Sequence, residues 1–268
     1  MIIYAPAKIN IGLKILNQRE DLYHNLDSLF YPIPLYDLLE VTKSEEFNIN
    51  ITGIPIIGNL KDNLIYKAWD LIRKYHNIGG IDVHLHKQIP TGAGLGGGSS
   101  DASNTLKCLN SLYLLNLNNS TLEKYAAELG ADCPFFIRAK ASRAQGIGTD
   151  ISDIELDLSN YYLVLVKPDI HISTKEAYSN VNLEGKNDSL NLGVIPNMGK
   201  WKFEFVNSFE NKLFKLYPVL EELKRELYDL GAIYASMSGS GATIYGIFKN
   251  KPDIPKKWDS HFVWIKKL

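Results

Sequence analysis

Hydrophobic and polar residues alternate along much of the first third of the chain, and alternation with a period of two predicts β-strands. Three segments show this alternation: residues 2–16, 47–54 and 81–89. Between the last two segments, from Leu64 onward, hydrophobic residues recur every three or four positions, which predicts an amphipathic helix. Asp62 stands just before this run and is the expected N-cap of the helix.

The second half of the chain shows the same two periods in a different order. Residues 161–166 form a short apolar run, which predicts a buried strand. From Phe209 to Leu230, hydrophobic residues are spaced four and three apart, and Pro218 interrupts them. This spacing permits a coiled coil, but two consecutive core helices, the second beginning at Pro218, fit it better. Residues 232–248 then predict two strands joined by a glycine-containing turn.

Composition limits the kind of protein that these elements can build. The chain has 268 residues, of which 45% are hydrophobic and 22% charged, and its net charge is −1. These values are typical of a soluble globular protein with one large or two small domains. The balanced charge favours no nucleic-acid partner, and no apolar run approaches the roughly 20 residues that span a membrane.

The N-terminus and the cysteines indicate the cellular compartment. The apolar N-terminal segment has no basic stretch before it, so we expect no secretory signal. Cys108 and Cys133 are the only cysteines, which is too few for a disulfide scaffold and does not fit the spacing of a structural zinc site. We therefore expect a cytoplasmic protein.

A glycine-rich segment, PTGAGLGGGSSDAS at residues 90–103, lies between a predicted strand and a helix that we expect to start near Ser100. Glycines let backbone N–H groups approach an anion, and the start of a helix adds unpaired donors and the positive end of its dipole. The hydroxyls of Ser99 and Ser100 can also reach a phosphate oxygen or a magnesium ion. The segment therefore predicts a phosphate site, against the alternative of a loop without a ligand.

Two common phosphate-binding motifs fit this segment poorly. The pattern GxxxxGK[ST] is absent, because no lysine lies in the loop or just after it. The dinucleotide-binding pattern GxGxxG is satisfied from Gly92 to Gly97, but it requires an acidic residue about 20 positions further on. Residues 110–119 contain no acid, so a dinucleotide-dependent oxidoreductase is the weaker hypothesis.

The glycine-rich segment resembles the phosphate-binding motif of the GHMP kinase superfamily. Residues 5–10 (APAKIN) and 236–242 (SMSGSGA) resemble the two flanking motifs of that superfamily. Residues 23–30 (YHNLDSLF) and 129–136 (LGADCPFF) are similar to the branch that phosphorylates a cytidine-diphosphate-linked methylerythritol in the non-mevalonate isoprenoid pathway. The resemblance runs from residue 5 to about residue 246, which is nearly the whole chain.

This resemblance implies an α+β fold of two domains. Residues 1–155 would form the N-terminal, ATP-binding domain of GHMP kinases with its glycine-rich phosphate loop. Residues 156–268 would form the ferredoxin-like C-terminal domain, with the active site in the cleft between the two. The polar stretch at residues 139–160 is where we expect the transition.

The implied reaction transfers the γ-phosphoryl group of ATP to the 2-hydroxyl of that substrate, with Mg²⁺ as cofactor, and gives the 2-phosphate and ADP. Asp132 matches the catalytic base of the family and Lys8 matches its catalytic lysine; only the fold can join them, because they are 124 positions apart. Ser100 is the candidate magnesium ligand, with phosphates and water completing the coordination. Without the family, a surface lysine and an aspartate closing a helix would be the simpler interpretations.

The resemblance also assigns residues to the cytidine-linked substrate. Asn10 would contact its methylerythritol end, while Tyr23 and His24 would recognise cytosine by stacking and by hydrogen bonds to its polar edge. Tyr178 would supply the opposite aromatic face and Thr174 a hydrogen bond nearby. For Tyr178, a helix residue packed in the core is an equally simple interpretation.

A further group of residues is assigned to ATP and to the transferred phosphate. The residues assigned to ATP are Pro90, Thr91, Gly92, Ala93, Gly94, Leu95, Gly96, Gly97, Gly98, Ser99 and Ser100, with Lys87 and Asn63 near adenosine. Gly239 and Gly241 of the third motif would line the cleft beside the phosphate. Two positions depart from the family: Leu22 replaces the usual glycine before the Tyr-His pair, and Ala93 replaces a glycine of the loop.

Three other functions stay open at this point. The nearest is another GHMP kinase acting on mevalonate, homoserine or a sugar, against which the aromatic residues argue, because small polyols offer no base to stack on. A nucleotide-binding module without catalysis and the oxidoreductase named above are weaker. The expected partners are the small-molecule substrate and ATP, with no nucleic acid and no membrane, and we expect a monomer or a weak homodimer.

Overall fold

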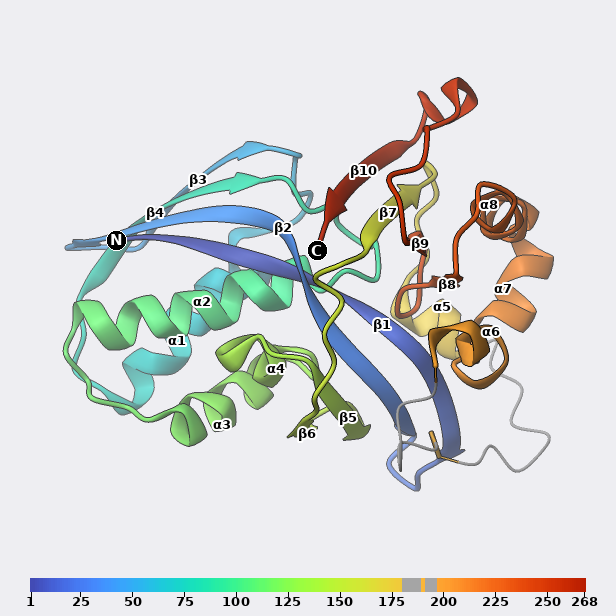
Figure 1. Cartoon of the computed structure of the whole chain (residues 1–268). Helices are drawn as coiled ribbons and strands as arrows, with labels where there is room; N and C mark the ends of the chain where they lie inside the picture. Colours follow the sequence, from blue (N-terminus) through green and yellow to red (C-terminus); the bar gives the residue numbers. More distant parts are fainter. Residues whose placement is uncertain (180–188, 191–196) are drawn as a thin grey trace. The chain divides into compact units, whose positions relative to one another are not determined.

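A computed structural model describes residues 1–179, 189–190 and 197–268 of the chain. These residues form two compact units, and the chain passes from one unit to the other several times (Figure 1). The first unit contains residues 1–8, 32–91 and 96–140, and the remaining described residues belong to the second. The long strands β1 (Ile2–Gln18) and β2 (His24–Ser44) contribute residues to both units. The division into domains at residue 155 stays a prediction.

A β-sheet covered by helices on one face builds the first unit (Figure 1). The second half of β2 pairs antiparallel with β4 (Gly80–Lys87), and β4 pairs parallel with β3 (Asn48–Gly53). The covering helices are α1 (Leu64–Tyr75), α2 (Gly97–Leu112), α3 (Asn119–Leu129) and α4 (Cys133–Arg138). Alternate residues of β4 point into this core, so the predicted period of two is confirmed there.

The starts of two helices differ from the sequence prediction. Asn63, not Asp62, is the N-cap of α1, because its side-chain oxygen accepts a hydrogen bond from the Ile65 N–H at 2.8 Å. Asp62 ends the short 3-10 helix η1 (Leu60–Asp62). Helix α2 begins at Gly97, three residues earlier than predicted, so part of the glycine-rich segment forms its first turn.

The β-strands of the second unit pair in two separate sets. The first half of β2 pairs with β5 (Ser142–Gly146), which pairs with β6 (Asp150–Asp153). A separate antiparallel sheet has the order β10 (Phe262–Lys267), β7 (Tyr162–Lys167), β9 (Ile244–Phe248) and β8 (Tyr234–Met237). Numbered along the chain, this order is 4-1-3-2, the antiparallel order expected of a ferredoxin-like domain.

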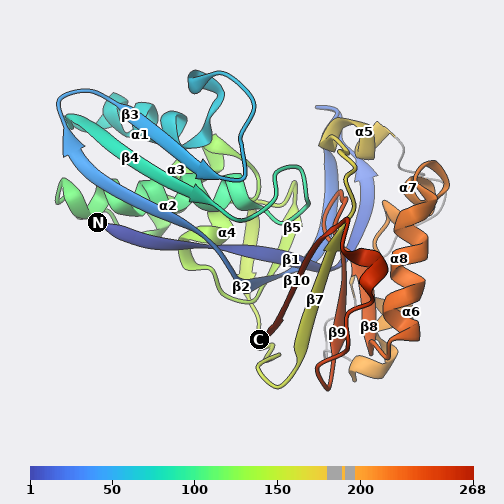
Figure 2. The ribbon, with the colours of Figure 1, turned by 90° about the horizontal axis from the view of Figure 1, so that it is seen from above.

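Helices cover one face of this four-stranded sheet, as Figure 2 shows for α7 and α8. The second unit contains α5 (Thr174–Ser179), α6 (Trp201–Glu204), α7 (Glu210–Leu216), α8 (Pro218–Asp229), η2 (Met198–Lys200) and η3 (Lys256–Trp258). Pro218 is the first residue of α8, so two consecutive helices are confirmed and a coiled coil is excluded. None of the described helices is long and apolar enough to cross a membrane.

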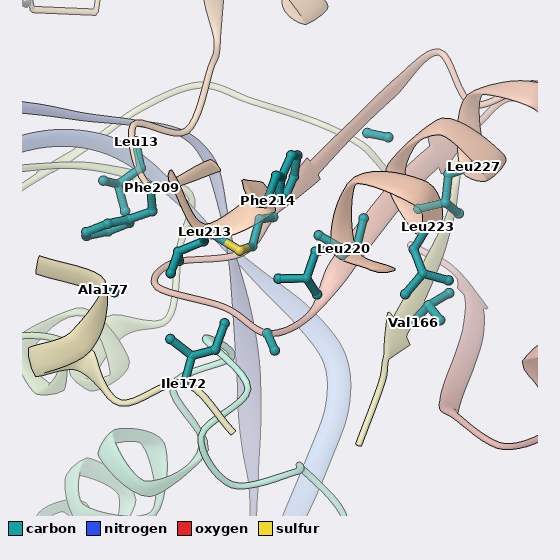
Figure 3. Packing of buried hydrophobic residues seen from close by; sticks show 14 of the residues in the cluster. Leu13, Val166, Ile172, Ala177, Phe209, Leu213, Phe214, Leu220, Leu223 and Leu227 are labelled. Carbon is teal, nitrogen blue, oxygen red and sulfur yellow. The ribbon is translucent and has the colours of Figure 1, made fainter. Parts of the chain in front are cut away.

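The core of the second unit explains the four-three spacing. Leu213 on α7 and Leu220, Leu223 and Leu227 on α8 are buried against the sheet (Figure 3). Leu216 breaks the pattern with 53% of its surface exposed, at the last residue of α7. The four-three spacing of hydrophobic residues therefore comes from the buried faces of two separate helices, with the exposed Leu216 between them.

Candidate active site

Lys8 and Asp132, predicted as the catalytic pair, are in contact in the first unit. Lys8 Nζ lies 3.3 Å from Asp132 Oδ2. The lysine side chain is 3% exposed, whereas the aspartate side chain is 34% exposed. A buried ammonium beside a partly exposed carboxylate orients that carboxylate and leaves it accessible to a ligand.

Helices α4 and α2 hold the position of Asp132. The residue precedes α4 and makes no capping hydrogen bond with its side chain, so the carboxylate is not used by the helix. Ser103 on α2 donates its hydroxyl to the carbonyl of Cys133 at 2.7 Å, which fixes the backbone next to Asp132. A Cβ on Gly96 would lie 3.2 Å from Lys8 Cγ and 2.8 Å from Phe136 Cζ, so the start of α2 also packs against this pair.

The glycine-rich loop adopts the backbone conformations for which glycine is suited. Gly92, Gly94 and Gly96 have φ values of 59°, 71° and 71°. Gly96 is the N-cap of α2, and a Cβ on Gly97 would lie 2.9 Å from Lys87 Nζ. Helix α2 thus begins with glycines, whose N–H groups have no side chain of their own residue beside them, as in a phosphate cradle.

Lys87 lies behind this cradle as part of a buried group of charges. Its Nζ binds a carboxylate oxygen of Asp37 and, at 2.8 Å, Oδ2 of Asp101. Asp37 Oδ1 also accepts the N–H groups of Gln88 and Ile89, at 2.6 and 2.9 Å. The Lys87 side chain is 1% exposed, and its contact with adenosine stays a prediction.

Asn63, the other residue predicted near adenosine, has a structural partner as well. Its side-chain oxygen caps α1. The neighbouring Leu64 lies 3.6 Å from the position that a Cβ on Gly98 would take, so the start of α1 packs beside the glycine-rich loop. A contact of Asn63 with ATP therefore stays a prediction.

Two opposing effects set the proton affinities of this buried group. Burial lowers the pKa of Lys87, but the attraction of Asp101 and Asp37 outweighs it and raises that pKa above its usual value. Burial raises the pKa of Asp101 to about 7, and Lys87 opposes this only in part. Oδ1 of Asp101 is buried without a hydrogen-bond partner. Burial thus makes the Asp101 carboxyl a weaker acid in the folded protein than in the unfolded chain.

Replacing Asp101 by Asn should flatten the pH dependence of stability. Because the pKa is raised on folding, the folded protein holds a proton that the unfolded chain releases above about pH 4, so the unfolding free energy falls as the pH rises towards 7, by at most about 1.4 kcal/mol per pH unit. Denaturant titrations at about pH 5 and about pH 7 measure this slope. Asp82→Asn, at an exposed position of the same unit, should keep the parental slope. Equal slopes for Asp101→Asn and the parent would contradict the expectation.

In the second unit, the glycine-rich loop contacts the third predicted motif. Ser238 donates its hydroxyl to the carbonyl of Gly94 at 2.8 Å and accepts the N–H of Asn10 at 3.3 Å. The Asn10 side chain donates to the Ser28 hydroxyl at 2.9 Å. A Cβ on Gly239 would lie 3.2 Å from Asn10 Oδ1 and 3.2 Å from the carbonyl oxygen of Gly94. Asn10, the loop and the third motif therefore form one packed cluster.

The residues predicted to bind cytosine lie partly together. His24 stacks on Tyr178 with ring centroids 5.0 Å apart and planes 29° from parallel, and Tyr178 meets Phe209 edge-on. Burial lowers the pKa of His24, which favours the neutral imidazole. Thr174, one helical turn before Tyr178 on α5, is exposed, and the Tyr23 side chain is 62% exposed. Because His24 covers one face of Tyr178, a base can occupy that face only if the two rings separate.

Leu22 occupies a turn that normally requires glycine. Its φ is 67°, and its N–H donates to the carbonyl of Arg19 at 3.1 Å. Asp21 accepts the N–H of Tyr23 at 3.1 Å and pairs with the Arg19 guanidinium at 2.9 Å. The turn that glycine would form is thus present, with leucine in a left-handed conformation.

Leu22→Gly should raise the unfolding free energy by up to about 1 kcal/mol without loss of activity, because it removes the strain of a left-handed leucine. Denaturant unfolding measures the change. Leu216→Gly serves as the comparison, since this exposed leucine lies in helix α7 and the same substitution should destabilise the protein there. A lower stability for Leu22→Gly would contradict the expectation.

Ser100 is the residue predicted to ligate magnesium. Among the described residues there is no group of three or more His, Cys, Asp or Glu side chains that could hold a metal ion. Ser100 is fully buried, and its hydroxyl oxygen accepts from the Asn104 side chain at 3.3 Å. That Ser100 ligates magnesium stays a prediction.

Sequence reasoning missed several residues that hold these groups in place. Asp101 and Ser238 stood within the quoted motifs, but no role was predicted for them. Lys87 shares the strand parity of the buried residues Ile81, Val83 and Leu85, and that parity could have indicated its burial. Asp37 gave no such signal, because its contact with Lys87 spans 50 positions of the chain.

Comparison with known protein families identifies the class of protein to which this chain belongs. The family model described as the N terminal domain of GHMP kinases matches residues 63–140. The model of the GHMP kinase C terminal region matches residues 189–262. Together the two models cover more than half of the chain, and the fold and the glycine cradle agree with them. The class of protein is therefore that of the GHMP kinases.

Comparison with individual proteins narrows this further. A 4-diphosphocytidyl-2-C-methyl-D-erythritol kinase of Bacteroides thetaiotaomicron is 45% identical over 271 residues, which cover 99% of each chain. A crystal structure of a 4-(cytidine 5'-diphospho)-2C-methyl-D-erythritol kinase is 34% identical with a TM-score of 0.79 and covers 92% of this chain and 90% of its own. The chain belongs to the family of 4-diphosphocytidyl-2-C-methyl-D-erythritol kinases.

A more distant structure shows the fold alone. The homoserine kinase of Cytophaga hutchinsonii is 16% identical with a TM-score of 0.73, over 99% of this chain and 93% of its own. Kinases of different substrates thus share this architecture, and the substrate has to be argued from the site.

Proposed function

We propose that the protein transfers the γ-phosphoryl group of ATP to the 2-hydroxyl of 4-diphosphocytidyl-2-C-methyl-D-erythritol. The observation that carries this proposal is the 3.3 Å contact of Lys8 with Asp132, which joins residues 124 positions apart at the start of the glycine-rich helix. A buried ammonium that points its charge at a partly exposed carboxylate places that carboxylate where a bound ligand can meet it. Family membership indicates which hydroxyl compound it serves.

In this proposal, Asp132 accepts the proton of the 2-hydroxyl as the new P–O bond forms. Its carboxylate is partly exposed and is not used as a helix cap, so it can accept a hydrogen bond from a substrate hydroxyl. Lys8 keeps the carboxylate oriented and adds positive charge where the phosphoryl group is transferred. Both residues act by positioning and electrostatics, which phosphoryl transfer chiefly requires.

The glycine-rich loop would bind the phosphates of ATP through backbone N–H groups. This role is supported by the glycines at the N-cap and at the first two positions of α2, and by the positive φ values before the helix. Mg²⁺ would be held mainly by the phosphates and water, as this ion commonly is, with the Ser100 hydroxyl as the predicted protein ligand. Asp37, Lys87 and Asp101 would support the loop from behind.

The second unit would bind the cytidine-linked substrate. The proposed contacts of the base are Tyr23, His24, Tyr178 and Thr174. The proposed contact of the methylerythritol end is Asn10. The exposed ring of Tyr23 offers a stacking face, and Tyr178 offers a second when His24 moves. Asn10 is two residues from Lys8 on β1, which supports its place near the reacting hydroxyl.

A substrate panel tests this function directly. Purified protein should consume ATP with 4-diphosphocytidyl-2-C-methyl-D-erythritol and not with mevalonate, homoserine or a free sugar. Product should carry the phosphate on the 2-hydroxyl, as phosphorus NMR can determine. Equal turnover with mevalonate or homoserine would refute the proposed substrate.

We also propose a cytoplasmic location and a monomer or weak homodimer. Support for the compartment comes from Cys108 and Cys133, which are both free and buried. Burial raises their pKa values to about 11 and about 12, so neither is a reactive thiolate at neutral pH. Sedimentation of the purified protein over a range of concentrations measures the oligomeric state.

A further inference from the structure

The turn of the third motif is held by two side chains from another part of the second unit. This turn, residues 238–241, connects β8 to β9, and its glycines Gly239 and Gly241 have φ values of 54° and 90°. Asn207, just before α7, and Glu210, the first residue of α7, both contact the turn or the residues leading into it. Neither was singled out by its sequence pattern.

Asn207 fixes two carbonyl groups at once. Its side-chain Nδ2 donates to the carbonyl of Met237 at 2.8 Å and to the carbonyl of Gly239 at 2.8 Å. Its Oδ1 accepts the N–H of Phe209 at 2.9 Å. Both donors of the amide are used, and the residue is buried, so this geometry is specified rather than incidental.

Glu210 fixes the strand that leads into the turn. Its Oε1 accepts the N–H of Met237 at 2.8 Å and the hydroxyl of Ser236 at 3.1 Å. Its Oε2 accepts from Lys224 Nζ at 2.6 Å. A buried carboxylate is costly unless it is paired and hydrogen-bonded, and here every contact serves the residues before the turn or compensates the charge.

These contacts determine the direction of one particular peptide group. Across a trans peptide bond, the C=O and the following N–H point in opposite directions. Because Asn207 binds the carbonyl of Gly239, the N–H of Ser240 points away from Asn207. Two other N–H groups of the turn are used inside the protein, since the Ser238 N–H donates to the Thr243 carbonyl at 2.9 Å and the Gly241 N–H donates to the Ser238 carbonyl at 3.0 Å.

We propose that Asn207 and Glu210 are positioning residues for phosphoryl transfer, which orient the peptide between Gly239 and Ser240 so that its N–H donates to a phosphate oxygen. The same turn packs against Asn10 and Gly94, the proposed contacts of the substrate and of ATP. Asn207 and Glu210 touch neither ligand and act through the turn. The effect that we expect on kcat rests on the proposed function. The effect that we expect on the conformation of the turn does not rest on it.

Asn207→Asp is the first test, because it keeps the shape and replaces both donors by acceptors that face two carbonyl oxygens. We expect kcat to fall at least about tenfold, with the KM for the cytidine-linked substrate within about threefold, since the turn does not contain the proposed base contacts. Hydrogen exchange of the amides in residues 236–242 should become faster. Asn211→Asp, at an exposed position on α7, is the matched control and should behave as the parent in both measurements.

A pair of substitutions at Glu210 gives an independent test if Asn207→Asp does not fold. Glu210→Gln keeps an oxygen that can accept the Met237 N–H, whereas Glu210→Ala does not. We expect the Gln variant to retain most of the parental kcat and slow exchange, and the Ala variant to lose both. Circular dichroism at the assay temperature would establish that each variant is folded.

The outcomes separate the two proposals. A folded Asn207→Asp or Glu210→Ala variant with parental kcat and parental exchange would overturn the positioning role. A variant with a lower melting temperature and unchanged kcat per folded molecule would also overturn it, because it would show a merely structural role. The unsubstituted protein could fail to turn over the cytidine-linked substrate while the variants still show faster hydrogen exchange in residues 236–242. That result would support the role of Asn207 and Glu210 in orienting the turn and would refute the proposed function.

Discussion

Asp132→Asn should abolish turnover while leaving ATP binding largely intact. Asparagine has nearly the same shape but cannot accept a proton, and it removes the charge that faces Lys8 at 3.3 Å. Loss of a general base typically costs about 10²- to 10⁴-fold in rate. The glycine-rich loop, which supplies the proposed phosphate contacts, contains neither residue, so the affinity for ATP should change little.

Steady-state kinetics and calorimetric titration with a non-hydrolysable ATP analogue measure the two effects separately. Asp70→Asn is the matched control, because it removes a partly exposed Asp–Lys pair with a similar distance, 3.4 Å to Lys74, from the same unit. That variant should keep the parental kcat. If Asp132→Asn retained more than about a tenth of the parental kcat, Asp132 would not be the base.

Gly94→Ala should disrupt both stability and activity. A Cβ at this position would lie 1.9 Å from the carbonyl oxygen of Ser238 and 3.1 Å from that of Gly241. Atoms cannot approach so closely, so the glycine-rich loop and the third-motif turn would have to move apart. Displacement of reacting groups by about 1 Å can cost about 10²-fold in rate, and we expect a loss of kcat/KM of at least that size.

Gly146→Ala isolates the steric part of this effect. Gly146 has a φ of 62°, close to the 71° of Gly94, but a Cβ there would meet nothing within 4 Å. Both substitutions carry the cost of a left-handed alanine, about 1–2 kcal/mol, and only Gly94→Ala adds the collision. Thermal unfolding and kinetics of the two variants should therefore differ strongly. Similar losses in both would show that backbone strain alone is responsible.

Much of the fold could be predicted from the sequence, because the period of the hydrophobic residues matches the buried face of each element. Strand β4 and the helices α7 and α8 follow the predicted hydrophobic periods, since burial of one face is what those periods report. The start of α1 was missed by one residue, because Asp62 and Asn63 are both good N-caps and only the backbone decides between them. The left-handed turn at Leu22 could be suspected only from the family, not from leucine itself.

The site could be predicted in part, and for a different reason. Periodicity gave no indication that Lys8 meets Asp132; the motif resemblance did, because it carries long-range geometry that one sequence does not display. The residues that support the site could not be predicted, for the same reason. Asp37 meets Lys87 and Asn207 meets Gly239 through contacts 50 and 32 positions apart, and no local pattern encodes such pairs.

The two buried cysteines make the protein convenient for site-directed labelling. At neutral pH a thiol-reactive dye should leave Cys108 and Cys133 untouched, so the natural chain behaves as a cysteine-free background. One cysteine introduced at Ile57 in the first unit and one at Phe203 in the second, both strongly exposed, could each carry a fluorophore. Energy transfer between the dyes would then measure, in single molecules, whether the distance between the two labelled residues depends on ATP or on the hydroxyl substrate.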